Sequence, residues 1–350
     1  DLGVLQVNTD GSGDSPGEHV FVGRVRKEVL ERSYVGAIVT DRRDGEQSNQ
    51  VVGADARLVV KKHLTLLGLL AGSSDTRVCA AGWTTQLGAQ WLSDLLQADV
   101  NYVDVGDAFT PAVGFVRRHD RMIGSRVAFK PRPGWRHVRQ LEVTPNAVAY
   151  HDHQGIPQSS EFGVSVATYL ESGDRLFAKF DTQSEFLTDP FEINPGVVLG
   201  AGRYKWTSGE VSFQTFDGRK LSGSAEANIG HFYTGTQGSY EFGLDYRPDK
   251  HFSVEASYEF NDVDLREGAF RTHLIGVKSN ISFTNSLLAS AYAQYNNTGS
   301  LAALQVRLNY IFRTIDNVYL VYNETRYTNG PQAGRSNRSL LAKITYSLHR

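Results

Sequence analysis

The sequence predicts an all-β protein: an antiparallel transmembrane β-barrel of about 20 strands, within a range of roughly 16 to 22. Three observations support this fold class. Apolar and polar residues alternate with a period of two, tight turns alternate with longer connections, and the 350 residues include 34 Gly, 16 Tyr and 18 Phe. The whole chain, 1–350, is therefore predicted to form a single outer-membrane barrel domain.

Composition excludes other classes of protein. Hydrophobic residues make up 40% of the chain, yet no stretch approaches the roughly 20 unbroken apolar residues of a membrane helix. A closed barrel is the remaining way to cross a lipid bilayer. The formal net charge of −2 creates no field that would attract nucleic acid. The single cysteine, Cys79, leaves no disulfide framework.

Alternation is clearest near the C-terminal end of the chain. In 251–261 one face carries large apolar side chains such as Phe252 and Phe260, whereas the other carries Glu255 and Glu259. A soluble core does not accept such carboxylates, but a wet barrel lumen does. The same reasoning predicts strands at 120–130, 138–149, 159–171, 174–187, 219–232, 239–246, 303–312 and 338–349.

Two segments depart from simple alternation. In 87–103 the spacing of Trp91 and Leu95 suits a helix, but the context favours a single strand there. In 203–216 the apolar phase slips near Ser208, and a β-bulge is the simplest interpretation.

The connections predict the topology. Tight turns rich in Pro, Asp, Asn and Gly alternate with longer connections. Outer-membrane barrels have short periplasmic turns and long extracellular loops. The longer connections, predicted to be extracellular, are 10–18, 42–49, 105–118, 150–157, 188–202, 262–269, 296–300 and 328–337.

Charged residues on the inward faces are candidate lumen residues, namely Arg24, Arg26, Glu241, Asp245, Glu255, Glu259 and Arg307. Two interpretations remain open. The charges form a permeation pathway, or they form ion pairs that brace neighbouring strands.

The loops 105–118 and 188–202 are the candidate binding site. Both are long, aromatic and stiffened by proline, so they are expected either to fold into the mouth as a constriction or ligand ledge, or to pack the rim. If they fold inward, their phenylalanines are expected to meet and their charges to pair across the mouth. The candidate residues are Asp107, Phe109, Phe115, Arg117, Arg118, Asp189, Phe191 and Glu192.

The triplet His151-Asp152-His153 offers a different chemistry. Two histidines around an aspartate suit a metal site or a barrel hydrolase. No nucleophile motif accompanies them, and loop histidines are usually solvated. No catalytic residue, metal or cofactor is therefore predicted, and a hydrolase remains the alternative function.

Seven segments in order resemble a bacterial outer-membrane barrel family of unknown function. They are 23–40, 105–118, 190–204, 230–235, 262–270, 294–296 and 320–324. The resemblance implies a barrel at the C-terminal end of a longer protein, commonly after a family-nine carbohydrate-binding module. It implies no catalytic residues. It also implies that further barrel segments precede residue 1, since the chain opens within an expected strand and has no signal peptide.

The predicted function is that of an outer-membrane pore, transport or scaffold component. A link to carbohydrate binding or uptake follows from the resemblance alone. The expected partners are outer-membrane lipid or lipopolysaccharide and a glycan or other small solute, whereas no nucleic-acid partner is expected.

Overall fold

The computed structural model describes residues 1–11, 17–45, 47–77 and 80–347. Cys79 and the end of the predicted last strand lie outside these residues. Among the described residues, no helix is long and apolar enough to cross a membrane.

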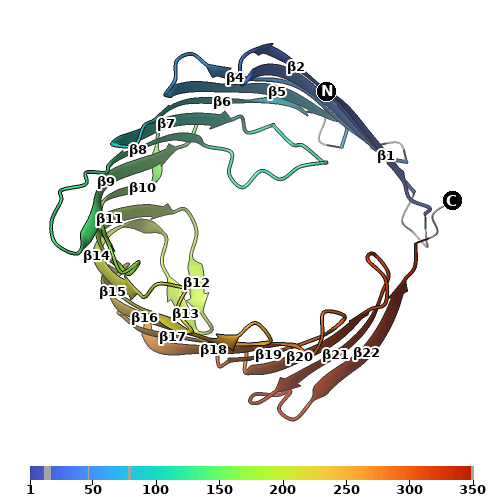
Figure 1. Ribbon diagram of the computed structural model, residues 1–350. Coiled ribbons are helices and arrows are strands. Elements are labelled where there is room, and N and C mark those ends of the chain that lie inside the picture. Colours follow the sequence, from blue (N-terminus) through green and yellow to red (C-terminus); the bar gives the residue numbers. More distant parts are fainter. Residues whose placement is uncertain (12–16, 46, 78–79, 348–350) are drawn as a thin grey trace.

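Twenty strands form one antiparallel sheet, each paired with its neighbours in chain order (Figure 1). This confirms the predicted fold class. The strands are β1 (Leu2–Asn8), β2 (Glu18–Leu30), β3 (Ser33–Asp44), β4 (Gln47–Val59), β5 (Leu64–Asp75), β6 (Ala80–Leu92), β7 (Leu96–Val105), β8 (Arg121–Phe129), β9 (Val138–His151), β10 (Pro157–Leu170), β11 (Arg175–Leu187), β14 (Gly202–Gln214), β15 (Leu221–Phe232), β16 (Gly235–Asp249), β17 (Phe252–Leu265), β18 (Gly268–Ser282), β19 (Leu287–Asn296), β20 (Leu301–Ile311), β21 (Asn317–Tyr327) and β22 (Ser336–Thr345).

The sheet curves into a ring, with β1 and β22 as its edge strands (Figure 1). In the part of the chain that the structure describes, β1 pairs only with β2, and β22 pairs only with β21. The remaining two strands, β12 (Phe191–Asn194) and β13 (Val197–Leu199), form a separate hairpin inside the ring.

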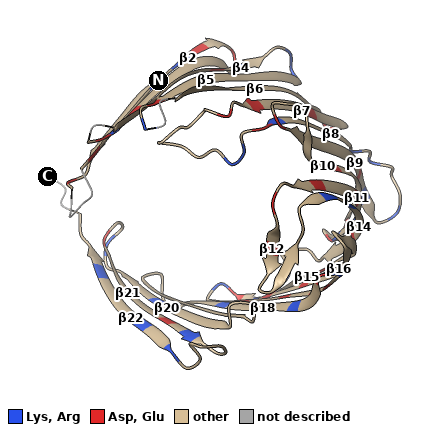
Figure 2. Cartoon of the chain, turned by 180° about the vertical axis from the view of Figure 1, so that it is seen from behind, with Lys and Arg blue, Asp and Glu red and all other residues tan. Residues whose placement is uncertain are grey.

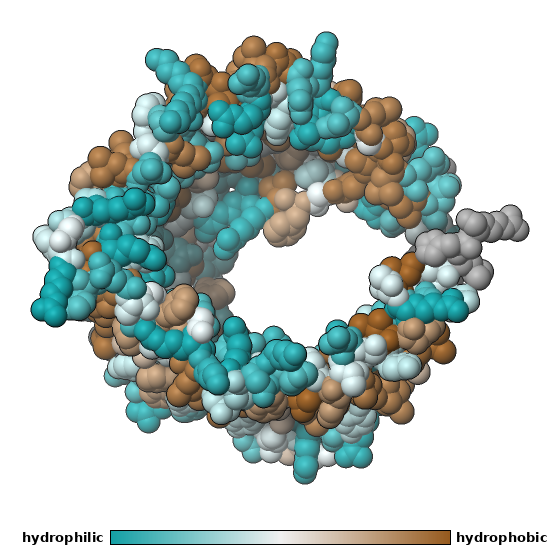
Figure 3. All heavy atoms as spheres, viewed as in Figure 1, coloured by the Kyte–Doolittle hydropathy of each residue, from teal (hydrophilic) through white to brown (hydrophobic). Residues whose placement is uncertain are grey.

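The inward hairpin identifies the lumenal face of each strand. Val263 and Leu265 of β17 are buried against it, so the odd-numbered side chains of β17 face the lumen. Phe242 and Leu244 of β16, which lie opposite even-numbered residues of β17, are 50% and 52% exposed on the outer face. A space-filling view shows apolar residues widely spread over the outside of the ring (Figure 3). The alternation that predicts the strands therefore separates lipid from lumen.

The connections at one end of the ring differ less in length from those at the other end than the sequence predicts. The segments 106–120 and 188–201 are indeed long. However, β3 and β4 are joined by two residues, and only residues 266–267 separate β17 from β18. The predicted loops 42–49 and 262–269 are therefore wrong, because their Asp- and Asn-rich ends continue as paired strand.

Two further expectations are corrected. Segment 87–103 is two strands, because Ser93 accepts a hydrogen bond from the amide nitrogen of Leu96 and closes a turn between β6 and β7. The bulge near Ser208 is absent: β14 pairs with β11 without a register shift. The apolar phase slips there because Trp206 faces the lumen, where it packs on Tyr233 and is only 8% exposed.

Candidate functional site

The connection between β7 and β8, residues 106–120, folds back over the lumenal side of the wall and is called the ledge below (Figure 1). It leaves the wall at Gly106, whose amide nitrogen donates to the carbonyl oxygen of Trp83 at 2.9 Å. Its backbone then crosses Gly82 of β6 so closely that a Cβ atom there would lie 2.1 Å from the nitrogen of Phe109. A glycine at this position allows the ledge to lie flat on the sheet.

Asn49 of β4 anchors the ledge by its side-chain amide. Its Nδ2 donates to the carbonyl oxygen of Thr110 at 2.6 Å, and its Oδ1 accepts from the amide nitrogen of Ala112 at 2.9 Å. Asn49 is 2% exposed and also donates to Asp75, which Arg77 holds in an ion pair. Every polar atom of this buried amide is thereby used in holding loop backbone or strand.

The aromatic ring of Phe109 provides the apolar part of the anchor. Phe109 is buried against Val51 of β4 and Ala71 of β5, with Val105 and Val116 beside them. The amide nitrogen of Thr110 also donates to Ser73 Oγ at 3.0 Å. The ledge is thus fixed to the wall by packing and by hydrogen bonds that converge on Phe109 and its neighbours.

A pocket of about 590 Å³ lies between the ledge and the lumenal wall. Phe115 at its edge is 89% exposed. Arg118 stacks over the ring of Tyr150 at 4.9 Å and donates to Ser159. Arg117 also lines the pocket and has no hydrogen-bond or ion-pair partner among the described residues. The pocket therefore combines an exposed aromatic ring with a free guanidinium group.

His153 fastens the ledge at its base. Its Nδ1 lies 2.8 Å from Asp107 Oδ1 at the start of the ledge, and its Nε2 lies 3.0 Å from Asp104 Oδ1 at the end of β7. The hydrogen bond to Asp104 has the largest effect and raises the pKa of His153; burial opposes it, and the hydrogen bond to Asp107 raises the pKa further. Two carboxylates on one imidazole favour its charged form, in which both nitrogens donate.

The hairpin β12–β13 is the second inward segment, and Gly196 in its turn has a φ of 82°. Glu192 Oε1 accepts from the amide nitrogen of Gly196 at 2.8 Å and closes the turn. Val197 and Leu199 are 7% and 0% exposed against the lumenal side of β17. The hairpin is therefore held mainly by apolar packing, whereas the ledge is held largely by hydrogen bonds.

The rings of Phe232 and Tyr233 pack against the buried side chains of the hairpin, and Trp206 packs on these two rings. The ring of Trp206 of β14 lies 4.6 Å from that of Tyr233 and 5.9 Å from that of Phe232. Tyr233 has a φ of 45° in a two-residue turn, and its hydroxyl donates to Glu185. This cluster supports the hairpin from the wall.

The two inward segments do not make the predicted contact across the mouth. Phe109 is buried on β4 and β5, and Phe191 is 48% exposed on the hairpin. Arg118 binds Tyr150 and Ser159 instead of Asp189 or Glu192. The prediction was wrong because each segment docks on its own sector of wall. A central opening remains between them and the opposite wall in the space-filling view (Figure 3).

The chain is similar to known proteins in its three-dimensional structure but not in its sequence. No protein-family model and no curated protein sequence matches the chain. The siderophore receptor PirA from Pseudomonas aeruginosa matches with a TM-score of 0.58 at 11% identity, over 99% of this chain and 73% of that one. The ferric-catecholate import receptor Fiu from E. coli K12 matches with a TM-score of 0.56 at 8% identity, over 99% of this chain and 74% of that one. The copper transporter OprC matches with a TM-score of 0.54 at 12% identity, over 98% of this chain and 71% of that one.

The chain shares its β-barrel fold with these outer-membrane proteins. Together with its apolar outer face, this fold places it in the bacterial outer membrane, as the sequence predicts. The similar proteins are transporters and receptors. The predicted association with a carbohydrate-binding module stays a prediction.

Six of the seven lumen residues identified from sequence fall into two groups, whereas Glu259 accepts a hydrogen bond from Asn261 Nδ2 at 2.8 Å. Several are paired: Arg24 with Asp55 at 2.8 Å, Arg26 with Asp1 at 2.6 Å, and Glu255 with Lys278 at 3.3 Å. Asp245 pairs with Arg247. These contacts favour the bracing interpretation for those positions. Arg307 and Glu241 have no hydrogen-bond or ion-pair partner within the described ranges. Figure 2 shows where charged positions lie along the strands.

A row of glutamates crosses four neighbouring strands. The strand register places Glu226 opposite Glu241 and Glu241 opposite Glu259, and Glu210 lies on the adjoining strand β14. Sequence identifies Glu241 and Glu259 as inward-facing, but the alignment of the row depends on register between strands. The row gives this sector of the lumen an acidic surface.

The His151-Asp152-His153 triplet serves the local structure. Asp152 Oδ1 accepts from the amide nitrogens of Gln154 and Ile156 at 2.9 and 2.7 Å, and so closes the loop. Both nitrogens of His153 are bonded to carboxylates. No group of three or more His, Cys, Asp or Glu side chains in the described chain is arranged to hold a metal ion. The geometry therefore gives the hydrolase alternative no support.

Proposed function

We propose that the chain forms the wall of an outer-membrane transport barrel in which the ledge and the hairpin limit which small solutes pass. The observation that carries the proposal is the anchoring of both segments on the lumenal wall, with a passage left beside them. The buried amide of Asn49 holds the ledge on the lumenal wall, and this fixed position favours a role for the ledge in the lumen. The similarity of fold to a copper transporter and to siderophore receptors supports the same general role.

The pocket under the ledge is the proposed solute contact. Exposed Phe115 offers a ring for stacking, and Arg117 offers a free guanidinium that binds carboxylate or hydroxyl oxygens. Aromatic rings also stack on the apolar faces of sugars. Glycans are the candidate solutes that the family resemblance supplies, so oligosaccharides of increasing length are suitable probes.

The test is solute entry into proteoliposomes that contain the purified protein. Deleting residues 108–114 removes the anchored part of the ledge, and we expect oligosaccharide flux to rise several-fold because the passage widens. The matched control deletes residues 330–333, which are exposed in the loop before β22 and belong to neither inward segment. Equal flux through the parent protein and the ledge deletion, or none through either, would refute the proposal.

A further inference from the structure

A hollow of about 520 Å³ lies on the wall formed by β7 to β11 and β14. It opens on the outer face, because Val100, Ile123 and Phe162 at its margin are 50%, 55% and 59% exposed. The lumenal side of the same strands is different: Asp181 is 1% exposed, and Glu161 pairs with Lys179. The hollow therefore faces lipid. Its volume falls within the range of small-molecule sites.

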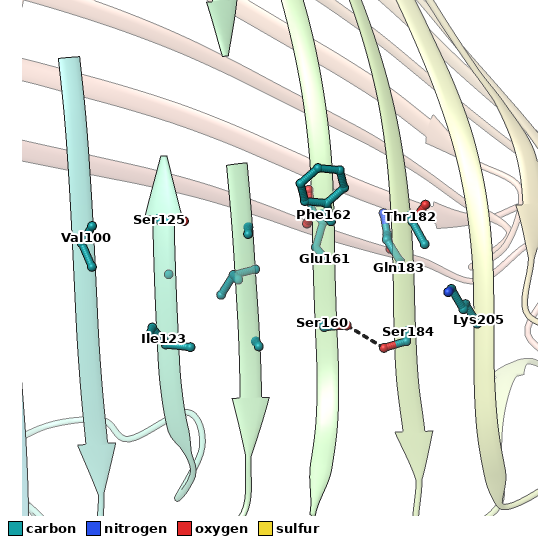
Figure 4. A pocket seen from close by; sticks show the side chains of 14 residues that line it. Val100, Ile123, Ser125, Ser160, Glu161, Phe162, Thr182, Gln183, Ser184 and Lys205 are labelled. Carbon is teal, nitrogen blue, oxygen red and sulfur yellow. Dashed lines mark hydrogen bonds between the residues drawn. The ribbon is translucent and has the colours of Figure 1, made fainter. Parts of the chain in front are cut away.

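Small side chains make the floor of the hollow (Figure 4). The register aligns Ala149, Ser160, Ser184 and Lys205 in one transverse row. The hydroxyls of Ser160 and Ser184 lie 2.7 Å apart and are hydrogen-bonded to each other. Because Ala149, Ser160 and Ser184 replace the large apolar side chains common elsewhere on the outer face, they leave a depression, and Lys205 gives it a polar edge.

The hollow lies near the end of the barrel that carries the ledge. Lys205 is three residues from the start of β14, and Phe162 is five residues from the start of β10. At about 3.3 Å per residue and a tilt of about 40°, Phe162 lies roughly 13 Å below that end. This depth corresponds to one leaflet of a bilayer, and it is the outer leaflet if the long connections are extracellular.

Positive charge gathers at the upper edge. Lys205 is exposed and has no hydrogen-bond or ion-pair partner in the described parts of the chain. Arg203, two residues nearer the end, stacks over Phe186 at 4.5 Å and donates to the carbonyl oxygen of Pro157. Both cations are on the outer face. Arg121 is paired there with Asp104, so it adds no net charge.

We propose that this hollow binds a phosphorylated glycolipid of the outer leaflet, of the lipopolysaccharide type. One acyl chain lies in the hollow, and a phosphate group binds Lys205 and Arg203. A second hollow of about 500 Å³ on the outer face, around Leu176 and Ala225, has an apolar margin without Lys or Arg. A membrane lipid with a neutral head group would fit either hollow, whereas the cations select an anion at the first.

Binding is tested with purified hexa-acylated lipid A bearing two phosphates. The protein is delipidated, incubated with this lipid and analysed by native mass spectrometry. We expect Lys205→Gln to weaken retention about fivefold, since one cation near an anionic surface contributes about 1 kcal/mol, and Lys205→Arg to restore it. Ser184→Leu fills the hollow and should lower retention, whereas Ala225→Leu in the second hollow should not.

Lipid A without phosphates should bind the parent protein more weakly than lipid A with phosphates binds the Lys205→Gln variant, because that variant keeps Arg203. Equal retention by all variants, or equal retention of both forms of lipid A, overturns the proposal. A second copy of the chain occupying the hollow would appear as a dimer that Ser184→Leu abolishes, and this result also overturns it. Variants are compared only after they show the heat-dependent gel shift of a folded barrel.

The orientation of the barrel has its own test. In a Cys79→Ser background, a membrane-impermeant maleimide should label intact cells at Gln332→Cys, at the end that carries the ledge, and not at Asp249→Cys, at the opposite end. The reverse pattern would place the hollow in the inner leaflet and overturn the lipopolysaccharide proposal. It leaves the solute-transport proposal untouched, because transport through the lumen does not depend on which end faces outward.

Discussion

Replacing Gly82 by alanine is expected to lift the ledge from the wall without altering the barrel. The new Cβ atom would lie 2.1 Å from the nitrogen of Phe109 and 2.2 Å from the carbonyl carbon of Ala108. Both are backbone atoms, so no side-chain rotation relieves the contact. The ledge must move by at least about 1 Å, because close-packed carbon atoms do not approach nearer than about 3 Å.

That displacement breaks the anchor, including three hydrogen bonds in which a backbone amide is the donor. They join Gly106 to Trp83, Thr110 to Ser73 Oγ, and Ala112 to Asn49 Oδ1, at 2.9, 3.0 and 2.9 Å. At about 1 kcal/mol each, their loss favours the released ledge by about 3 kcal/mol, which is roughly a hundredfold in population. Phe109 would leave its site on β4 and β5 at the same time.

Hydrogen exchange measures this directly, because the amide hydrogens of Thr110 and Ala112 are donors in two of these bonds. We expect their protection to fall about a hundredfold in Gly82→Ala, with the strands of the wall unchanged. Gly72→Ala is the control: its added Cβ atom would have no contact nearer than 3.7 Å. If both amides stay protected in Gly82→Ala, the anchoring described above is wrong.

Three other perturbations test separate parts of the structure. Because the pKa of His153 is raised, the stability it contributes is complete below its ordinary pKa of about 6.5 and is lost as pH rises through the raised value; the protection of amides at the base of the ledge, relative to the intrinsic exchange rate at each pH, should therefore fall with rising pH in the parent protein and stay constant in His153→Gln. Leu244→Arg should destabilise the barrel by about 2–4 kcal/mol in reversible denaturation if it lies near the bilayer midplane, and Glu255→Arg much less; equal costs would refute the assignment of faces. Glu241→Gln should raise the unfolding free energy by about 0.5–1 kcal/mol, since it removes like charges on facing strands; a decrease would show that the carboxylate has a stabilising partner.

The strands were predictable because one physical contrast, lipid against water, repeats at every second residue. Phe242 and Glu241 are adjacent in sequence and lie on opposite faces, so their types reveal the strand without any knowledge of its partners. The turn at Ser93 was missed although Ser-Asp is a turn signal, because the apolar residues on both sides suggested an uninterrupted strand.

The docking of the ledge was beyond the reach of sequence patterns. Asn49 resembles any polar lumen residue, and nothing near it in sequence indicates that its amide binds backbone 61 residues away. The hairpin left a weaker signal: Val197 and Leu199 alternate between two glycines, which is typical of a short strand with one buried side. Contacts between elements that are not neighbours in the sheet depend on curvature and register, which local alternation does not encode.

The ledge docks on strands that precede it in the chain, whereas the hairpin docks on a strand that follows it, and this difference affects the order of assembly. The ledge rests on β4 and β5, which are synthesised before it, so its contacts are available as soon as β7 has paired. The hairpin rests on Val263 and Leu265 of β17, more than sixty residues later. In a barrel that grows from its first strands, the ledge docks early, whereas Val197 and Leu199 stay uncovered until β17 is in place. In the opposite order of growth, the hairpin finds its wall ready and the ledge waits.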